Sequence, residues 1–245
     1  SQWGHDFRPD YTRVGDFCEE LNIPQVCAFT ATATEIVRED IKVQLKRTNM
    51  SFLVTGFTRP NLAFSVSECN GNRREQYIRK ALAEKKPTLI YCASRKNVDE
   101  LSSSLGIRGY HAGMSDKERE NAQNYFIEDP CPVMAATNAF GMGIDRADIR
   151  RVIHYNYPGS LEAYYQEAGR AGRDGEQSEC VILYNFSDKF IHEFLIDMNN
   201  PGEQLVREVW SFLLNYSQEE QMQRLEMPQA EISLNVRTAK SDQQI

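Results

Sequence analysis

Between residues 62 and 184, short apolar segments alternate with longer segments that have the apolar spacing of helices. Short right-handed connections between such elements allow little other than parallel strands covered by helices. We therefore predict an α/β fold with a parallel sheet and helices on both faces. The predicted strands are 62–67, 88–92, 108–110, 133–136, 152–155 and 180–183, and the predicted helices include 73–83, 95–105 and one opened by the capping box 115–118.

The segments on either side of this alternation predict additional parts. Residues 26–31 and 51–55 are predicted as strands, with a helix from 35 to about 45 capped by Thr34. Gly56 and Pro60 bracket a crossing between two domains. We divide the chain into a partial first lobe (1–56), a second lobe (57–186), a helical extension packed on that lobe (187–216) and a polar linker or tail (217–245).

Composition excludes several classes of protein. The apolar fraction of 41% supports a real core, and no run of eighteen apolar residues or basic-then-apolar leader points to a membrane or to secretion. Six cysteines without a Cys-x-x-Cys pair argue against a zinc module and fit reduced thiols in a cytoplasm, with Cys27 and Cys92 expected in the core. The net charge of −7 means that any contact with nucleic acid must be local.

Segment 164–175 carries Arg170 and Arg173 near the end of a predicted helix, among the small residues Gly169, Ala171 and Gly172. A guanidinium stays charged and presents a planar fork of donors, which suits phosphate oxygens. Small neighbours let another surface approach closely. The alternative is a solvated helix face or a salt-bridge partner.

Segment 137–145 places two glycines and a carboxylate after the predicted strand 133–136. Glycines there let the backbone approach a phosphate, and Asp145 can hold a ribose hydroxyl or orient an arginine. A plain loop in which Asp145 caps a helix is the alternative.

The first eleven residues and segment 30–32 are two further candidates. Aromatic rings in a polar loop can stack on unpaired bases, each worth ~1–3 kcal/mol, and Arg8 can meet a phosphate. The alternative is that Trp3 and Phe7 pack into the core. Thr30 and Thr32 follow a predicted strand at the end where parallel sheets place ligand contacts, although a hydroxyl-bearing turn also explains them.

These segments resemble, in order, the motifs of RecQ helicases within superfamily 2. Residues 164–175 resemble the sixth motif in its RecQ form, 136–145 the fifth, 91–95 the fourth and 28–34 the third. Residues 110–113 resemble the loop after the fourth motif, 2–9 the aromatic-rich loop, and 57–61 the start of the second lobe.

The resemblance implies RecA-like lobes and a parent ATP-dependent DNA helicase that moves 3′ to 5′ in repair or recombination, with single-stranded or partly duplex DNA as partner. ATP and Mg²⁺ would be held mainly by residues outside this chain. By resemblance, Arg173 and secondarily Arg170 stabilise the transferred phosphoryl, Gln166 connects that site to the cleft, and Gly143 and Asp145 lie near the nucleotide. The implied DNA-contacting or coupling residues are Trp3, His5, Phe7, Arg8, Thr30, Thr32, Ser94, Arg95, His111 and Thr137.

The chain departs from the family in two ways. It has neither a Gly-x-x-x-x-Gly-Lys-Ser/Thr loop nor an Asp-Glu-x-His box, so we expect a fragment that hydrolyses no ATP alone. No cysteine follows Cys180, so the family's zinc site is not expected. A non-catalytic nucleic-acid-binding or interaction module is the alternative. A DEAD-box RNA helicase fits less well, because its sixth motif would open with His-Arg where Tyr165 and Gln166 stand.

Overall fold

The computed structural model describes residues 13–30, 33–54, 56, 58–70, 73–141, 145–200, 202–219 and 232. The strands between Leu62 and Tyr184 form a six-stranded sheet in the order β1-β6-β5-β2-β4-β3, in which every pairing is parallel. The strands are β1 Leu62–Glu68, β2 Thr88–Tyr91, β3 Arg108–Tyr110, β4 Val133–Ala136, β5 Arg151–His154 and β6 Ser178–Tyr184. The predicted parallel α/β fold is therefore confirmed.

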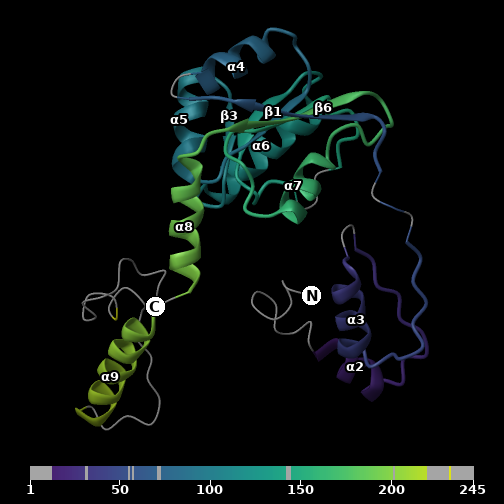
Figure 1. Ribbon diagram of the computed structural model, residues 1–245, viewed down its shortest axis with the longest axis vertical. Coiled ribbons are helices and arrows are strands. Elements are labelled where there is room, and N and C mark those ends of the chain that lie inside the picture. Colours follow the sequence, from purple (N-terminus) through teal and green to yellow (C-terminus); the bar gives the residue numbers. More distant parts are fainter. Residues whose placement is uncertain are drawn as a thin grey trace.

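Helices cover both faces of the sheet (Figure 1). They are α4 Arg73–Leu82, α5 Arg95–Leu105, α6 Asp116–Glu128 and α7 Leu161–Ala168. Alternate strand residues point to opposite sides, because side chains in a strand have a period of two. Leu89 packs in a cluster with Phe126 of α6 and Ala168 of α7. The next residue, Ile90, packs instead with Ile78 of α4 and Val98 of α5.

Polar side chains cap the helices that the sequence placed. Ser94 accepts a hydrogen bond from the backbone N–H of Asn97 at the start of α5 (3.1 Å). Ser115 and Glu118 form the predicted capping box of α6. Each cap satisfies donors that the first helical turn leaves without partners, so these helices begin where the capping residues stand.

The part of the chain before β1 differs from the prediction. It contains α2 Val14–Glu20, which was not predicted, and α3 Glu35–Gln44, which was. The structure assigns no strand to the described residues of segments 26–31 and 51–55, so those two predictions are wrong. A strand needs a neighbour for its backbone hydrogen bonds, and neither segment has one among the described residues. Cys27, predicted as core, is exposed, whereas Cys92 is buried.

Two helices follow β6. In α8 Asp188–Asn199, the first residue is buried in the lobe, and His192 Nε2 lies 2.7 Å from the carbonyl oxygen of Tyr157. In α9 Glu203–Glu219, Leu205 packs with residues of its own helix and with Ile232. Figure 1 shows α9 beyond the far end of α8, away from the sheet. The prediction that this second helix packs on the lobe is therefore wrong.

Residues 217–219 continue α9, and the rest of the predicted tail, apart from Ile232, lies outside the described residues. In the described part of the chain, no helix combines the length and the apolar character needed to cross a bilayer.

Candidate functional site

One group of predicted site residues lies at the carboxyl ends of β2, β4 and β3, which are neighbours in the sheet. Ser94 and Arg95 follow β2, His111 follows β3 and Thr137 follows β4. A Cβ placed on Gly113 would lie 3.1 Å from Nη1 of Arg95 and 3.2 Å from Nδ1 of His111. The side chains of Arg95 and His111 therefore lie against the same small residue.

Hydrogen bonds orient the His111 ring. The backbone N–H of Gly113 donates to Nδ1 of His111 (3.1 Å), and Nε2 lies 3.0 Å from Oδ1 of Asp99. Because Nδ1 accepts a hydrogen bond, the ring proton sits on Nε2 and is donated to Asp99. The imidazole is thus fixed in one tautomer at the edge of the site.

Thr137 links this edge to the loop that follows. Its side chain is buried, and its backbone N–H donates to the carbonyl oxygen of Tyr110 (3.1 Å). The carbonyl oxygen of Thr137 then accepts from the N–H of Phe140 (3.0 Å). The loop leaving β4 therefore starts from a fixed position beside β3.

The second group lies on the turn after α7, which we call the arginine turn (residues 169–173). The N–H of Gly172 donates to the carbonyl oxygen of Ile149 (2.9 Å), just before β5 begins. The arginine turn is thus held near the amino ends of β5 and β6, away from Ser94 and His111. The connection from β4 to β5 runs from one group to the other.

Arg170 turns inward from the arginine turn. Its Nη1 donates to the carbonyl oxygen of Gly141 (2.6 Å), and a Cβ on Gly141 would lie 2.2 Å from its Cζ. Gly141 has a φ of +131°, a conformation that favours glycine. Tyr91 is bonded nearby through its hydroxyl to the carbonyl oxygen of Phe140 (3.2 Å), and burial raises its pKa. Arg170 therefore joins the sixth-motif segment to the fifth.

Arg173 is the more exposed of the two arginines. Its Nη1 lies 3.5 Å from Oδ1 of Asp145, with side-chain exposures of 38% and 97%. The next residue, Asp174, accepts two hydrogen bonds from Arg150, which hold the pKa of its carboxyl below the usual range. Of the roles considered for Asp145, this contact matches the orientation of an arginine.

A hydrogen-bonded pair, buried His154 and half-buried Glu167 of α7, was missed by sequence reasoning. Nε2 of His154 lies 2.9 Å from Oε2 of Glu167, and Tyr91 and Tyr164 both pack against the His154 ring. Burial raises the pKa of Tyr164 to about 12. Since His154 ends β5 and Glu167 lies on α7, the pair fixes the helix that carries the arginine turn. A histidine in a predicted buried strand was the signal for it.

The remaining predicted residues are placed as follows. Gln166 is exposed on α7, and Thr30 is exposed in a segment without regular structure. Trp3, His5, Phe7, Arg8, Thr32 and Gly143 lie outside the described residues, so their predicted roles stay predictions.

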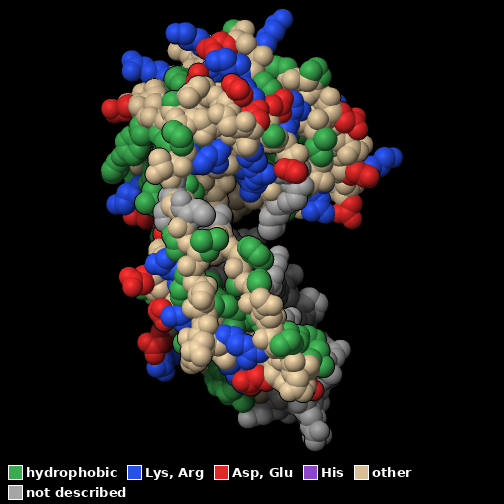
Figure 2. Space-filling model, turned by 90° about the vertical axis from the view of Figure 1, so that its right-hand side faces the viewer, with side chains coloured by type: hydrophobic (Ala, Val, Ile, Leu, Met, Phe, Trp, Pro, Cys, Tyr) green, Lys and Arg blue, Asp and Glu red, His purple; other side chains and the backbone are tan. Residues whose placement is uncertain are grey.

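Charge and possible metal ligands add little to these two groups. On the face drawn in Figure 2, Lys and Arg side chains are interspersed with Asp and Glu side chains. The described residues contain no group of three or more His, Cys, Asp or Glu side chains that could hold a metal ion.

Comparisons with known proteins define the class first. A family model described as the helicase conserved C-terminal domain matches residues 73–175. The yeast protein Dbp5, solved with RNA and ADP BeF3, superposes with a TM-score of 0.62 at 19% identity, over 78% of this chain and 52% of that one. A DEAD box protein from Methanococcus jannaschii gives 0.50 at 27% identity, over 69% and 47%. The lobe is a RecA-like helicase domain.

Sequence relatives narrow this class. The ATP-dependent DNA helicase RecQ of Bacillus subtilis is 42% identical over 211 residues, which are 83% of this chain and 35% of the relative. The helicase WRN of Mus musculus is 43% identical over 200 residues, 77% of this chain and 14% of the relative. RecQ-like BLM of Xenopus laevis is 41% identical over 211 residues, 82% and 16%. The chain belongs to the RecQ helicase family and spans about a third or less of these relatives.

Proposed function

We propose that this chain is part of an ATP-dependent DNA helicase of RecQ type that moves 3′ to 5′ and acts in DNA repair or recombination. In this proposal Arg173, and secondarily Arg170, stabilise the charge that develops on the transferred phosphoryl group. Gln166 connects that site to the interlobe cleft, and Gly143 and Asp145 lie near the nucleotide. ATP and Mg²⁺ would be bound mainly by residues that this chain does not contain.

The observation that carries the proposal is how Arg173 is held. Gly172 before it is bonded to Ile149, and Asp174 after it is bonded to Arg150. The guanidinium itself faces Asp145. A preorganised cation that does not need to reorganise during the reaction is what stabilisation of a phosphoryl transition state requires.

The same proposal assigns the other group to DNA. Ser94, Arg95, His111 and Thr137 would contact or sense the strand, together with the first-lobe residues Trp3, His5, Phe7, Arg8, Thr30 and Thr32. The chain from Thr137 to Asp145 begins at this group and ends beside Arg173. That continuity supports a coupling between the DNA and nucleotide sites. The cytoplasmic location expected from the sequence stays a prediction.

The test is strand separation by the full-length protein that contains this sequence. With ATP and Mg²⁺, we expect a duplex with a 3′ single-stranded tail to be unwound and one with a 5′ tail to remain paired. Unwinding from the 5′ tail alone would overturn the polarity. Binding of DNA without ATP-dependent unwinding of either substrate would favour the non-catalytic module.

The chain by itself is expected to be inactive, because it has no phosphate-binding loop and no Asp-Glu-x-His box. DNA-stimulated phosphate release from the purified 245-residue chain, above a vector-only control, would contradict this expectation.

A further inference from the structure

The segment that leads into β1 grips the arginine turn. Arg59 donates from Nη1 to the carbonyl oxygen of Gly169 (3.4 Å), and from Nη2 to those of Ala171 (3.1 Å) and Gly172 (2.8 Å). Asn61 donates from Nδ2 to the carbonyl oxygens of Gly172 (2.8 Å) and Glu176 (3.0 Å). Two side chains thus make four hydrogen bonds to the arginine turn and a fifth to Glu176 just after it, all more than a hundred residues later in the sequence.

We call Arg59 and Asn61 together the clamp, and the chemistry of their contacts suits this role. The carbonyls that Arg59 contacts follow directly after α7, at the negative end of the helix dipole, where a cation is favourable. A guanidinium fork can serve several carbonyl oxygens at once, whereas an ammonium acts as a point charge. Arg59 is half-buried and Asn61 is buried, so water competes little for these bonds.

Gly172 is shaped to this contact. Its φ is +53°, and a Cβ there would lie 2.6 Å from Nδ2 of Asn61. No side chain at this position would fit while the Asn61 contact is kept. The backbone conformation immediately before Arg173 is therefore tied to the clamp.

We propose that Arg59 and Asn61 are positioning residues for Arg173, and that the segment joining the two lobes sets the position of the arginine turn through them. The inference rests on the proposed function, since it assigns Arg173 a catalytic role. Arg59 lies between Gly56 and β1, so a displacement of this segment pulls on the carbonyls of residues 169–172. Movement between lobes would reach Arg173 through the backbone of its own turn.

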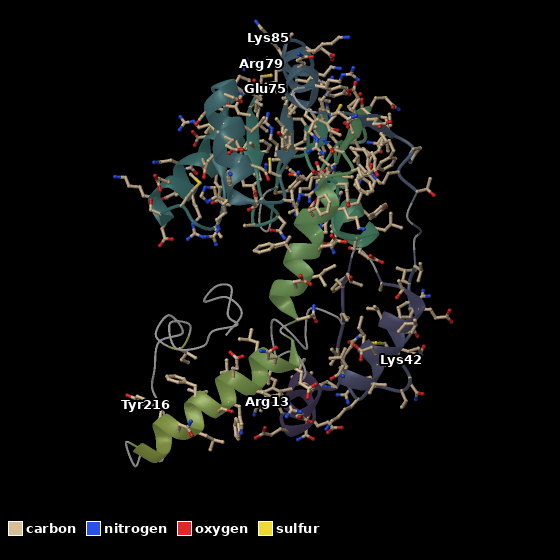
Figure 3. All side chains as sticks on the ribbon, turned by 60° about the vertical axis from the view of Figure 1, so that its left-hand side comes forward. Arg13, Lys42, Glu75, Arg79, Lys85 and Tyr216 are labelled. Carbon is tan, nitrogen blue, oxygen red and sulfur yellow. The ribbon has the colours of Figure 1, made fainter. Side chains whose placement is uncertain are left out.

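The experiment compares Arg59→Ala and Arg59→Lys with Arg79→Ala in the full-length protein. Arg79 is the control, because it also donates to a backbone carbonyl, that of Ser104, but does so from α4, where it pairs with Glu75 (Figure 3). In DNA-stimulated ATP hydrolysis we expect Arg59→Ala to lower kcat at least about tenfold, with KM for ATP within about threefold of wild type. Arg59→Lys should retain part of the rate. A kcat for Arg59→Ala within about twofold of Arg79→Ala would overturn the proposal.

A second background separates positioning from general structural damage. If Arg59 acts through Arg173, Arg59→Ala made in the Arg173→Lys variant should lower kcat further by less than about twofold. The reason is that the orientation of the residue-173 side chain is already lost there. An equal loss in both backgrounds would overturn the proposal. Should Arg59→Ala fail to fold, the same comparison of kcat in the wild-type and Arg173→Lys backgrounds is made with Arg59→Lys.

A readout independent of turnover completes the test. The amide of Gly172 is bonded to Ile149, so we expect hydrogen–deuterium exchange in the peptide covering 169–175 to accelerate in Arg59→Ala and not in Arg79→Ala. Unchanged exchange there would overturn the clamp. A wild-type protein without ATP hydrolysis would instead sink the proposed function, while the exchange result still decides the clamp.

Discussion

Arg173 and Asp145 face each other across two loops, with Nη1 of the arginine 3.5 Å from Oδ1 of the carboxylate. The sequence motifs left open whether Asp145 meets a ribose hydroxyl or an arginine. In the described structure the contact favours the arginine as the partner of Asp145. Loss of an arginine partner would affect kcat, whereas loss of a ribose contact would affect KM for ATP.

We predict that Asp145→Asn lowers kcat for ATP hydrolysis in the full-length protein by only about two- to fivefold. The carboxylate is 97% exposed, and an exposed ion pair is worth roughly 0.2–1 kcal/mol. Steady-state kinetics with DNA present measure this effect. A rise in KM for ATP of more than about tenfold at unchanged kcat would point to the ribose instead.

Gly141→Ala should displace Arg170, because the added Cβ would lie 2.2 Å from its Cζ. We expect a loss of ATP hydrolysis larger than that caused by Gly106→Ala. Gly106 also has a positive φ, +65°, but a Cβ there would meet nothing within 4 Å. The control therefore carries the cost of a side chain at a positive φ, about 1 kcal/mol, without the collision. Equal rates in the two variants would contradict the role given to Gly141.

Much of the fold could be predicted from the sequence, because hydrophobic period and capping are local signals. Ser94 and Ser115 begin α5 and α6 as expected, and β3 and β4 have the predicted bounds. The strand predictions for 26–31 and 51–55 were wrong, because a strand requires a pairing partner that the local sequence does not reveal.

The site was less accessible to prediction. In the motif, Arg170 and Arg173 occupy equivalent Gly-Arg positions, yet one turns to Gly141 and the other to Asp145. Arg59 was recognised only as part of a family segment, since its partners lie more than a hundred residues away. Such contacts follow from the parallel pairing of β1 with β6, which no local pattern states.

Asp188→Ala should destabilise the second lobe by roughly 3–5 kcal/mol, because it leaves the Arg74 guanidinium buried without its counter-ion. Asp188 also accepts from Asn156 (3.0 Å), and the Arg74 and Asp188 side chains are 8% and 2% exposed. Urea denaturation measures the loss. The exposed pair of Arg79 with Glu75, labelled in Figure 3, provides the control. Glu75→Ala should lower the free energy of unfolding by less than about 1 kcal/mol. Similar losses for both variants would contradict the stabilising role given to the buried Arg74–Asp188 pair.

Acid should reduce the stability that the carboxylates paired with Arg151 contribute to the fold. Hydrogen bonds from Lys86 and then Arg151 lower the pKa of Glu84 from 4.5 to about 2. The pKa of Glu84 is lower in the folded than in the unfolded chain. The stability that its carboxylate contributes is therefore complete above pH 4.5 and is lost as pH falls toward 2. We expect the melting-temperature difference between wild type and Glu84→Gln to shrink over that range. A difference that grows on acidification would contradict this.

Replacement of Arg173 by alanine in the full-length protein tests the central claim most directly. DNA-stimulated ATP hydrolysis should fall by at least about a thousandfold, as for other arginine fingers, while the affinity for single-stranded DNA stays within about threefold. Arg207→Ala is the matched control, because this arginine lies exposed on α9 and pairs with Glu203. Turnover of Arg173→Ala within about tenfold of wild type would contradict the assignment of the finger.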